Sequence, residues 1–111
     1  MADYLQVITT TETREDARTI ARETVRARAA ACAQIVGPVT STFWWKGRVE
    51  EGEEFLCIMK TTSEAYDLLE QTIRSLHSYE VPEIIAVPVE AGGRDYLNWL
   101  SDEVDPLSTG R

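Results

Sequence analysis

The chain has 111 residues and a formal net charge of −8, with 19 acidic and 11 basic side chains. A chain of this length is the size of one domain, and we expect residues 1–111 to form it. The negative charge argues against nucleic acid and against anionic membrane surfaces as partners, because both attract clustered Lys and Arg. It is compatible with binding cations.

Segments that would place the chain in a compartment are not visible in the sequence. No apolar run is long enough to span a membrane, and the N-terminus lacks the basic-then-apolar pattern of a signal peptide. Cys32 and Cys57 form no Cys-x-x-Cys pair, so we interpret them mainly as small buried hydrophobes in a reduced compartment. A zinc site built from both cysteines and the single histidine lacks the expected close spacing. We therefore expect a cytoplasmic protein.

The first third of the chain predicts a strand followed by a helix. Residues 4–9 are rich in aromatic and β-branched side chains, which is typical of a strand. Thr13 is the expected N-cap of a helix that continues to about residue 30, because its apolar positions recur at helical spacing. The arginines of this helix are interpreted as a solvated face.

Two long β-like segments follow, at residues 32–45 and 48–61. Lys46-Gly47 between them predicts a hairpin turn. Gly37-Pro38 indicates an edge position, a bend or a bulge, and Gly52 indicates a bulge or kink. The acidic run around Gly52, at positions 50, 51, 53 and 54, is a candidate cation site, but a solvated hairpin face is the favoured interpretation.

The segment Phe55-Leu56-Cys57-Ile58-Met59 is apolar at every position, so both faces of this strand favour burial. Helices that cover one side of a sheet leave the second side to be covered by something else, and self-association is the simplest answer. The adjacent tryptophans Trp44 and Trp45 favour the same interpretation. The residues that we expect at a subunit interface are Trp44, Phe55, Cys57 and Met59.

The second half of the chain predicts a helix that ends near His77, a strand from residue 84 to about 90, and a short helix at about 95–104. Residues 105–111 are expected to fray. The full order is strand, helix, strand, strand, helix, strand and small helix. This order predicts an α+β fold of the ferredoxin-like split β-α-β type, with an antiparallel sheet and both long helices on one face.

The loop between the second long helix and the last strand is the most informative run for function. It holds His77, the only histidine, together with Tyr79, Glu80, Pro82 and Glu83. A structural role for the histidine is to cap carbonyls at the helix C-terminus. The functional alternative is a site that responds to protons or metals, because imidazole titrates near neutrality.

Several motifs together resemble the CutA family of divalent-cation tolerance proteins. They are Ala30-Ala31-Cys32, Trp44-Trp45-x-Gly47-x-Val49-Glu50, Lys60-Thr61, His77-x-Tyr79-Glu80-Val81-Pro82-Glu83 and Tyr96-Leu97-x-Trp99-Leu100. The match covers about residues 4–100. It implies a homotrimer of ferredoxin-like subunits whose hairpins reach across to neighbours and whose bare sheet faces meet inside.

The resemblance also implies a metal site, because copper binding is associated with some members. The family's site uses a cysteine on the first strand and two adjacent histidines, and here Thr9 and Leu76 stand at the cysteine and first histidine positions. His77 remains as the candidate ligand, with Glu80 and Glu83 as weaker ones. Without the thiolate, we expect at most weak binding of Cu²⁺ or another divalent cation.

Four classes of function follow from these observations. The leading one is a cytoplasmic trimer that binds divalent cations and affects copper tolerance. The alternative is a small-molecule sensor related in fold to P-II-type signalling trimers, with Lys60, Tyr79, Glu83 and Trp45, beside His77, in a cleft between subunits. We expect no enzyme, because no nucleophile motif or cofactor fingerprint is present. A purely structural trimer is the fourth.

Overall fold

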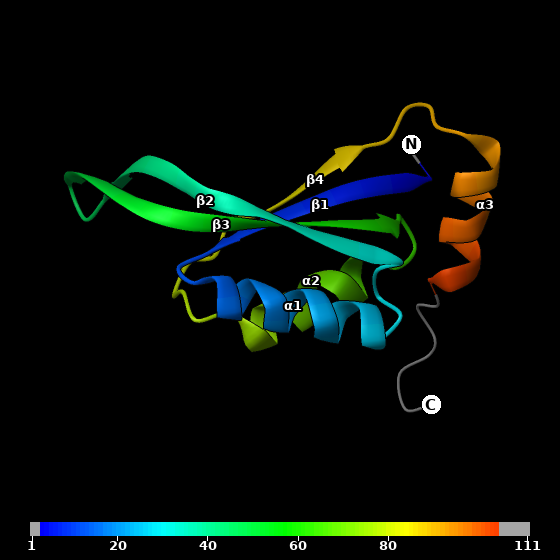
Figure 1. The fold of residues 1–111 in the computed structure, drawn as a ribbon, viewed down its shortest axis with the longest axis horizontal. Coiled ribbons are helices and arrows are strands. Elements are labelled where there is room, and N and C mark those ends of the chain that lie inside the picture. Colours follow the sequence, from blue (N-terminus) through cyan, green and yellow to red (C-terminus); the bar gives the residue numbers. More distant parts are fainter. Residues whose placement is uncertain (1–2, 105–111) are drawn as a thin grey trace.

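The computed structural model describes residues 3–104 and has the predicted order of elements (Figure 1). Along the chain these are β1 (Tyr4–Thr11), α1 (Arg14–Arg26), β2 (Cys32–Trp45), β3 (Arg48–Thr62), α2 (Tyr66–Leu76), β4 (Ile84–Pro88) and α3 (Arg94–Glu103). The four strands form one antiparallel sheet in the order β2-β3-β1-β4. Helices α1 and α2 cover one face and α3 lies at one end (Figure 1). The predicted α+β, ferredoxin-like architecture is confirmed, whereas the tail at 105–111 lies outside the described residues.

Helix α1 begins as predicted and ends earlier. The Thr13 hydroxyl accepts a hydrogen bond from the Asp16 backbone N–H at 3.1 Å, which satisfies a donor of the first turn. The helix ends at Arg26 and not near residue 30, because Arg28 adopts a positive φ of 61°. A left-handed residue after the last turn redirects the chain, and the Ala29 and Ala30 N–H groups both return to the Thr24 carbonyl.

The long hairpin of β2 and β3 turns at Lys46-Gly47, as predicted. Both turn residues have positive φ, 50° and 78°, which suits a two-residue turn of the primed type. The ladder is irregular at Gly37-Pro38, where the register shifts on edge strand β2 because proline has no N–H to donate. The predicted bulge at Gly52 is wrong, since Gly52 pairs with Ser41 inside a continuous register.

The core lies between the sheet and the two long helices. Its fully buried side chains are Val7, Cys57 and Met59 from the strands, Ala17 and Ile20 from α1, and Leu69 and Ile73 from α2. Two predicted interface residues, Cys57 and Met59, are therefore inside the subunit, with 0% exposure. Phe55 lies on the same face, packs against this core and carries the Arg14 guanidinium over its ring. The assignments of Cys57 and Met59 to a subunit interface are wrong, because alternate positions of β3 point toward the helices, whereas the assignment of the partly exposed Phe55 stays a prediction.

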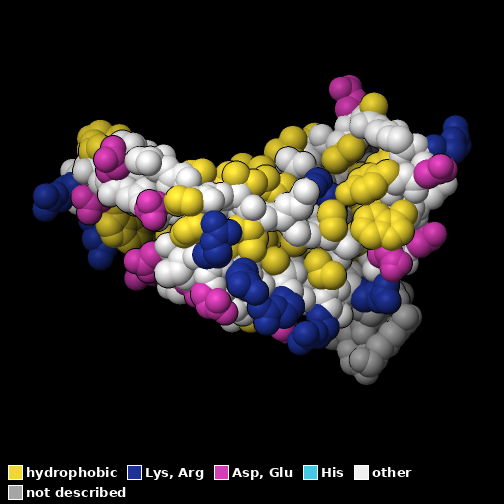
Figure 2. Space-filling view, in the orientation of Figure 1, with side chains coloured by type: hydrophobic (Ala, Val, Ile, Leu, Met, Phe, Trp, Pro, Cys, Tyr) yellow, Lys and Arg dark blue, Asp and Glu magenta, His cyan; other side chains and the backbone are white. Residues whose placement is uncertain are grey.

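The other face of the sheet has no covering helix and is mostly apolar, although the strand register also places Gln6, Gln34 and Lys60 on it (Figure 1). Strand pairing places Ile58 beside Ile8, Ile8 beside Ile85, and Val36 beside Leu56. We call Ile8, Val36, Leu56, Ile58, Ile85 and Val87 the open face. Val36, Ile85 and Val87 are 45%, 49% and 44% exposed, and Figure 2 shows hydrophobic side chains along the hollowed surface above the sheet. The two-sided apolar pattern of β3 thus divides between the core and the open face.

The two cysteines differ in their surroundings, which leads to a test of the core. Burial raises the pKa of the Cys57 thiol from 9.0 to about 12, whereas Cys32 is partly exposed. At pH 8 we expect a thiol reagent to modify one cysteine per native chain and both in denaturant. Because the folded state holds this proton more tightly, the stabilisation is complete below pH 9 and is lost as pH rises toward 12.

A chemical-denaturation series from pH 8 to 11 measures this loss, and Cys57→Ala gives the matched comparison. The substitution should flatten the part of the pH dependence that the thiol contributes. Rapid modification of both thiols in the native protein at pH 8 would contradict the burial of Cys57.

Candidate functional site

His77 ties the loop after α2 to the end of β1. Its Nε2 lies 2.8 Å from the Thr10 carbonyl oxygen and 3.1 Å from the Thr9 hydroxyl. Its Nδ1 accepts a hydrogen bond from the Tyr79 backbone N–H at 3.1 Å. A carbonyl oxygen only accepts, so Nε2 carries the proton and Nδ1 carries the lone pair. Both ring nitrogens therefore have partners inside the subunit.

These contacts correct the interpretation of the histidine as a cap of the helix carbonyls, and they bear on its interpretation as a metal ligand. His77 follows the last residue of α2 with extended backbone angles, and its ring reaches β1 and not the helix carbonyls. A metal ligand needs a free imidazole lone pair, and here the Tyr79 N–H occupies it. Thr9, at the family's cysteine position, is a partner of the same ring. The geometry thus indicates a structural role for His77, which holds the loop after α2 against the end of β1; we call this the fastening role.

Replacing His77 with Ala should lower the free energy of unfolding by about 1–3 kcal/mol, because the buried Thr10 carbonyl loses its ring partner. Urea denaturation measures the loss, and exposed Ser78→Ala in the same loop is the matched control. If His77→Ala leaves stability unchanged and instead abolishes cation binding, the ligand assignment is right and the fastening role is wrong.

A groove lies beside this loop, between it and the underside of the hairpin. It encloses about 880 Å³. Its charged lining consists of seven glutamates, Glu12, Glu50, Glu51, Glu53, Glu54, Glu80 and Glu83, and it has no Lys or Arg. Its aromatic lining consists of Phe43, Trp44, Trp45 and Tyr79. We call this the acidic groove. Its carboxylates produce a negative potential that concentrates cations from solution.

Tyr79 connects the two walls of the acidic groove. Its hydroxyl donates a 2.6 Å hydrogen bond to the Glu54 carboxylate, and its ring lies 5.0 Å from the His77 ring. Burial and the hydrogen bond to Glu54 raise the pKa of Tyr79 above its usual value, so the phenol stays protonated and remains a donor. A chain of contacts therefore runs from β1 through His77 and Tyr79 to the hairpin.

The predicted site residues separate into two groups. Trp44, Trp45, Tyr79, Glu80 and Glu83 all line the acidic groove, whereas His77 and Lys60 do not. Lys60 lies far along β3, where its ammonium group donates to the Gln34 side chain at 2.7 Å. Within one subunit, Lys60 therefore does not join the cluster expected for a sensor cleft.

Sequence reasoning missed part of the groove. Glu12 lies in the short connection before α1 and Phe43 in β2, and neither was singled out. The acidic run was noticed but assigned to a solvated face. The available signal was the cluster of glutamates on both sides of Gly52 in the hairpin. This face becomes a wall of the groove only because the loop at residues 79–83 approaches it in the folded chain.

Within residues 3–104, no group of three or more His, Cys, Asp or Glu side chains is arranged to hold a metal ion. The carboxylates of the acidic groove are thus spread along it. In the same part of the chain, no helix is long and apolar enough to cross a membrane.

Comparison with known proteins gives the family. The family model described as CutA1 divalent ion tolerance protein matches residues 5–103. The Divalent-cation tolerance protein CutA of Thermus thermophilus is 45% identical over 96 residues, which are 86% of this chain and 93% of that protein. The mouse Protein CutA is 42% identical over 92 residues, 83% of this chain and about half of the mouse protein (52%).

Solved structures agree with the sequence comparison. The Thermus thermophilus structure has a TM-score of 0.89 at 42% identity and covers 92% of this chain and 99% of its own. The CutA structure from Xylella fastidiosa has a TM-score of 0.90 at 32% identity, with 94% and 100% covered. With its split β-α-β sheet and a match along nearly its whole described length, the chain belongs to the CutA family of divalent-cation tolerance proteins.

Proposed function

We propose that this protein is a homotrimeric, non-catalytic cytoplasmic protein that binds divalent cations such as Cu²⁺ weakly and contributes to tolerance of them. The observation that carries the proposal is the acidic groove, with seven glutamates and no basic lining side chain. Names of relatives describe tolerance of divalent cations and no catalysis. Carboxylate oxygens bind divalent cations, and among first-row metals copper binds most tightly to a given site.

The expected affinity is weak for physical reasons. The Glu54 carboxylate already accepts the Tyr79 hydroxyl, and His77 offers no free lone pair. Glu80 and Glu83 line the groove and are exposed, so cations that they attract keep part of their water shell. This arrangement supports reversible collection of cations at raised concentration.

Calorimetric titration with Cu²⁺, Zn²⁺ and Ni²⁺ tests the proposal. We expect saturable binding with a Kd of about 1 mM or tighter, and a several-fold weakening in the double variant Glu80→Gln/Glu83→Gln. The matched control is Glu64→Gln/Glu90→Gln, which removes the same charge from exposed positions outside the groove. Absence of saturable binding, or equal weakening in both double variants, would contradict a site in the groove.

Trimer formation is supported by the open face. An uncovered apolar surface that crosses all four strands favours association, and a chain of this length gains stability from it. Three copies with cyclic symmetry would bury their open faces together, as the family resemblance implies. The sensor alternative has less support, because within one subunit Lys60 lies apart from Tyr79 and Glu83, and its cleft would have to form between subunits.

A further inference from the structure

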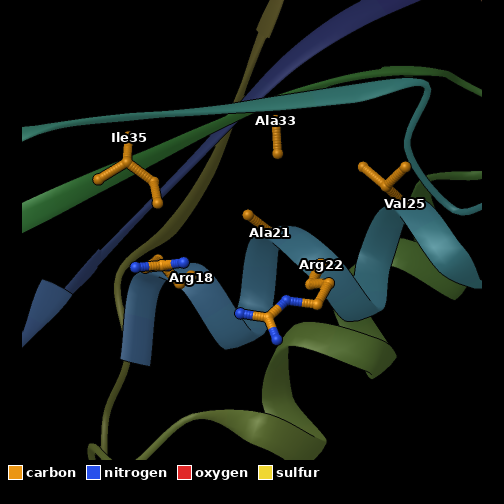
Figure 3. Close-up of a pocket in the computed structure, with 6 residues that line it drawn as sticks. All are labelled: Arg18, Ala21, Arg22, Val25, Ala33 and Ile35. Carbon is orange, nitrogen blue, oxygen red and sulfur yellow. The ribbon is translucent and has the colours of Figure 1, made fainter. Parts of the chain in front are cut away.

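A second cleft lies between α1 and the edge strand β2, and the cation proposal does not use it. It is a shallow, open depression of about 290 Å³, lined by Arg18, Ala21, Arg22, Val25, Ala33 and Ile35. Figure 3 shows Ala33 and Ile35 projecting from β2 toward α1, where Ala21 and Val25 face them. Small side chains on both walls leave the hollow open, and we call it the arginine cleft.

The two arginines of the cleft differ from the other arginines of α1. Arg14, Arg18, Arg22 and Arg26 recur at every fourth position, so they form one row along the helix, and Figure 2 shows basic side chains gathered over it. Arg14 donates to the Gly37 carbonyl at 3.1 Å, and Arg26 pairs with Glu23 at 3.2 Å. Across the described part of the chain, Arg18 and Arg22 are left without a hydrogen bond or ion pair. Of the four arginines in this row, the two without such a partner are thus the ones beside the cleft.

The chemistry of the lining specifies an anion with an apolar part. A guanidinium group binds a carboxylate or phosphate through two parallel hydrogen bonds. The walls offer only apolar side chains, Ala21, Val25, Ala33 and Ile35, which favour a small hydrocarbon group. The net charge of −8 repels anions from most of the surface, so this basic strip is a distinct location for one.

We propose that the arginine cleft binds a small amphipathic organic anion, a phosphate or carboxylate attached to a short apolar group. Arg18 and Arg22 hold the charged group at the margin, and the apolar group lies between α1 and β2. The volume is at the lower end of small-ligand pockets, which suits a short apolar group. This inference is independent of cation binding in the acidic groove.

The test is a nuclear magnetic resonance titration of the full chain with phenyl phosphate. A chelator is present in the buffer so that metal ions play no part. Inorganic phosphate and benzyl alcohol serve as probes of the two halves of the ligand. We expect saturable shifts of the Ala21, Val25, Ala33 and Ile35 amides with phenyl phosphate, and binding that is weaker by about tenfold for either half alone.

Three variants make the test specific. Arg18→Gln/Arg22→Gln should weaken phenyl phosphate by at least about tenfold, and Ala33→Leu should block it by filling the cleft. Arg26→Gln, on the same row but paired with Glu23, should leave it unchanged. Shifts scattered over the surface, equal losses for Arg26→Gln and the double variant, or no saturation at all would overturn the proposal.

Discussion

Ile58→Glu is expected to convert the protein from the proposed trimer to a folded monomer. Ile58 lies in the middle of the open face, paired with Ile8 on β1 and with Gln34 on β2. In a monomer its replacement carboxylate would be solvated, since the open face carries no helix. In a trimer the same carboxylate would be buried three times over, and the cation of this face, Lys60, already donates to the Gln34 side chain at 2.7 Å. Burial of an unpaired charge costs several kcal/mol per ion, which exceeds what an interface of this kind offsets.

Light scattering coupled to size-exclusion chromatography measures the outcome. Wild type should have a mass of about three times 12.5 kDa, and Ile58→Glu about 12.5 kDa. Circular dichroism should show that the variant keeps its fold, because Ile58 is outside the buried core. Val25→Glu is the control on the helix-covered side and should remain trimeric. A monomeric wild type, or an Ile58→Glu variant that stays trimeric, would contradict assembly through the open face.

The architecture was predictable because apolar side chains recur at different spacings in helices and in strands. Helical spacing in α1 and α2, a Lys-Gly turn with positive φ, and the order of the elements are local properties that tertiary contacts did not override. What failed was the assignment of faces within one strand. Cys57 and Ile58 are both apolar, and which of them faces the helices depends on the register with β1.

The end of α1 shows a different limit. Residues 26–30 suit a helix by propensity, yet Arg28 takes a left-handed conformation. Its guanidinium reaches Glu103 in α3, and the Thr61 hydroxyl donates to the Ala29 carbonyl at 2.7 Å. These contacts come from residues far away in sequence, so no local sequence pattern predicts them.

Some members of the candidate site were predictable, but their roles were not. The loop motif identified His77, Tyr79, Glu80 and Glu83 as a group, and the structure keeps them on one short segment. The chemistry of His77 depends on a backbone carbonyl of β1, to which a sequence offers no signal. From the sequence alone, the single imidazole in a loop with two glutamates favoured a ligand role, whereas the structure shows both ring nitrogens in contact with groups of the same subunit.

Leu69→Ala is expected to cause a large loss of stability, about 2–5 kcal/mol in the free energy of unfolding. Leu69 has 0% exposure in the core that α2 forms with α1 and the sheet. Truncation removes buried hydrocarbon and leaves a cavity that rigid neighbours from two helices and a sheet fill only in part. The preceding residue, Leu68, is half-buried at the edge of this core, so Leu68→Ala on the same helix is the matched control and should cost less.

Denaturant unfolding at one fixed protein concentration measures both variants, because assembly contributes to apparent stability by mass action. The comparison also separates the core from the interface. Leu69→Ala should lower the denaturation midpoint while the native mass stays that of a trimer. Ile58→Glu should instead lower the native mass to that of a monomer. Equal small losses for Leu68→Ala and Leu69→Ala would mean that α2 is loosely packed. The fastening of its following loop by His77 would then hold the helix more strongly than the buried core does.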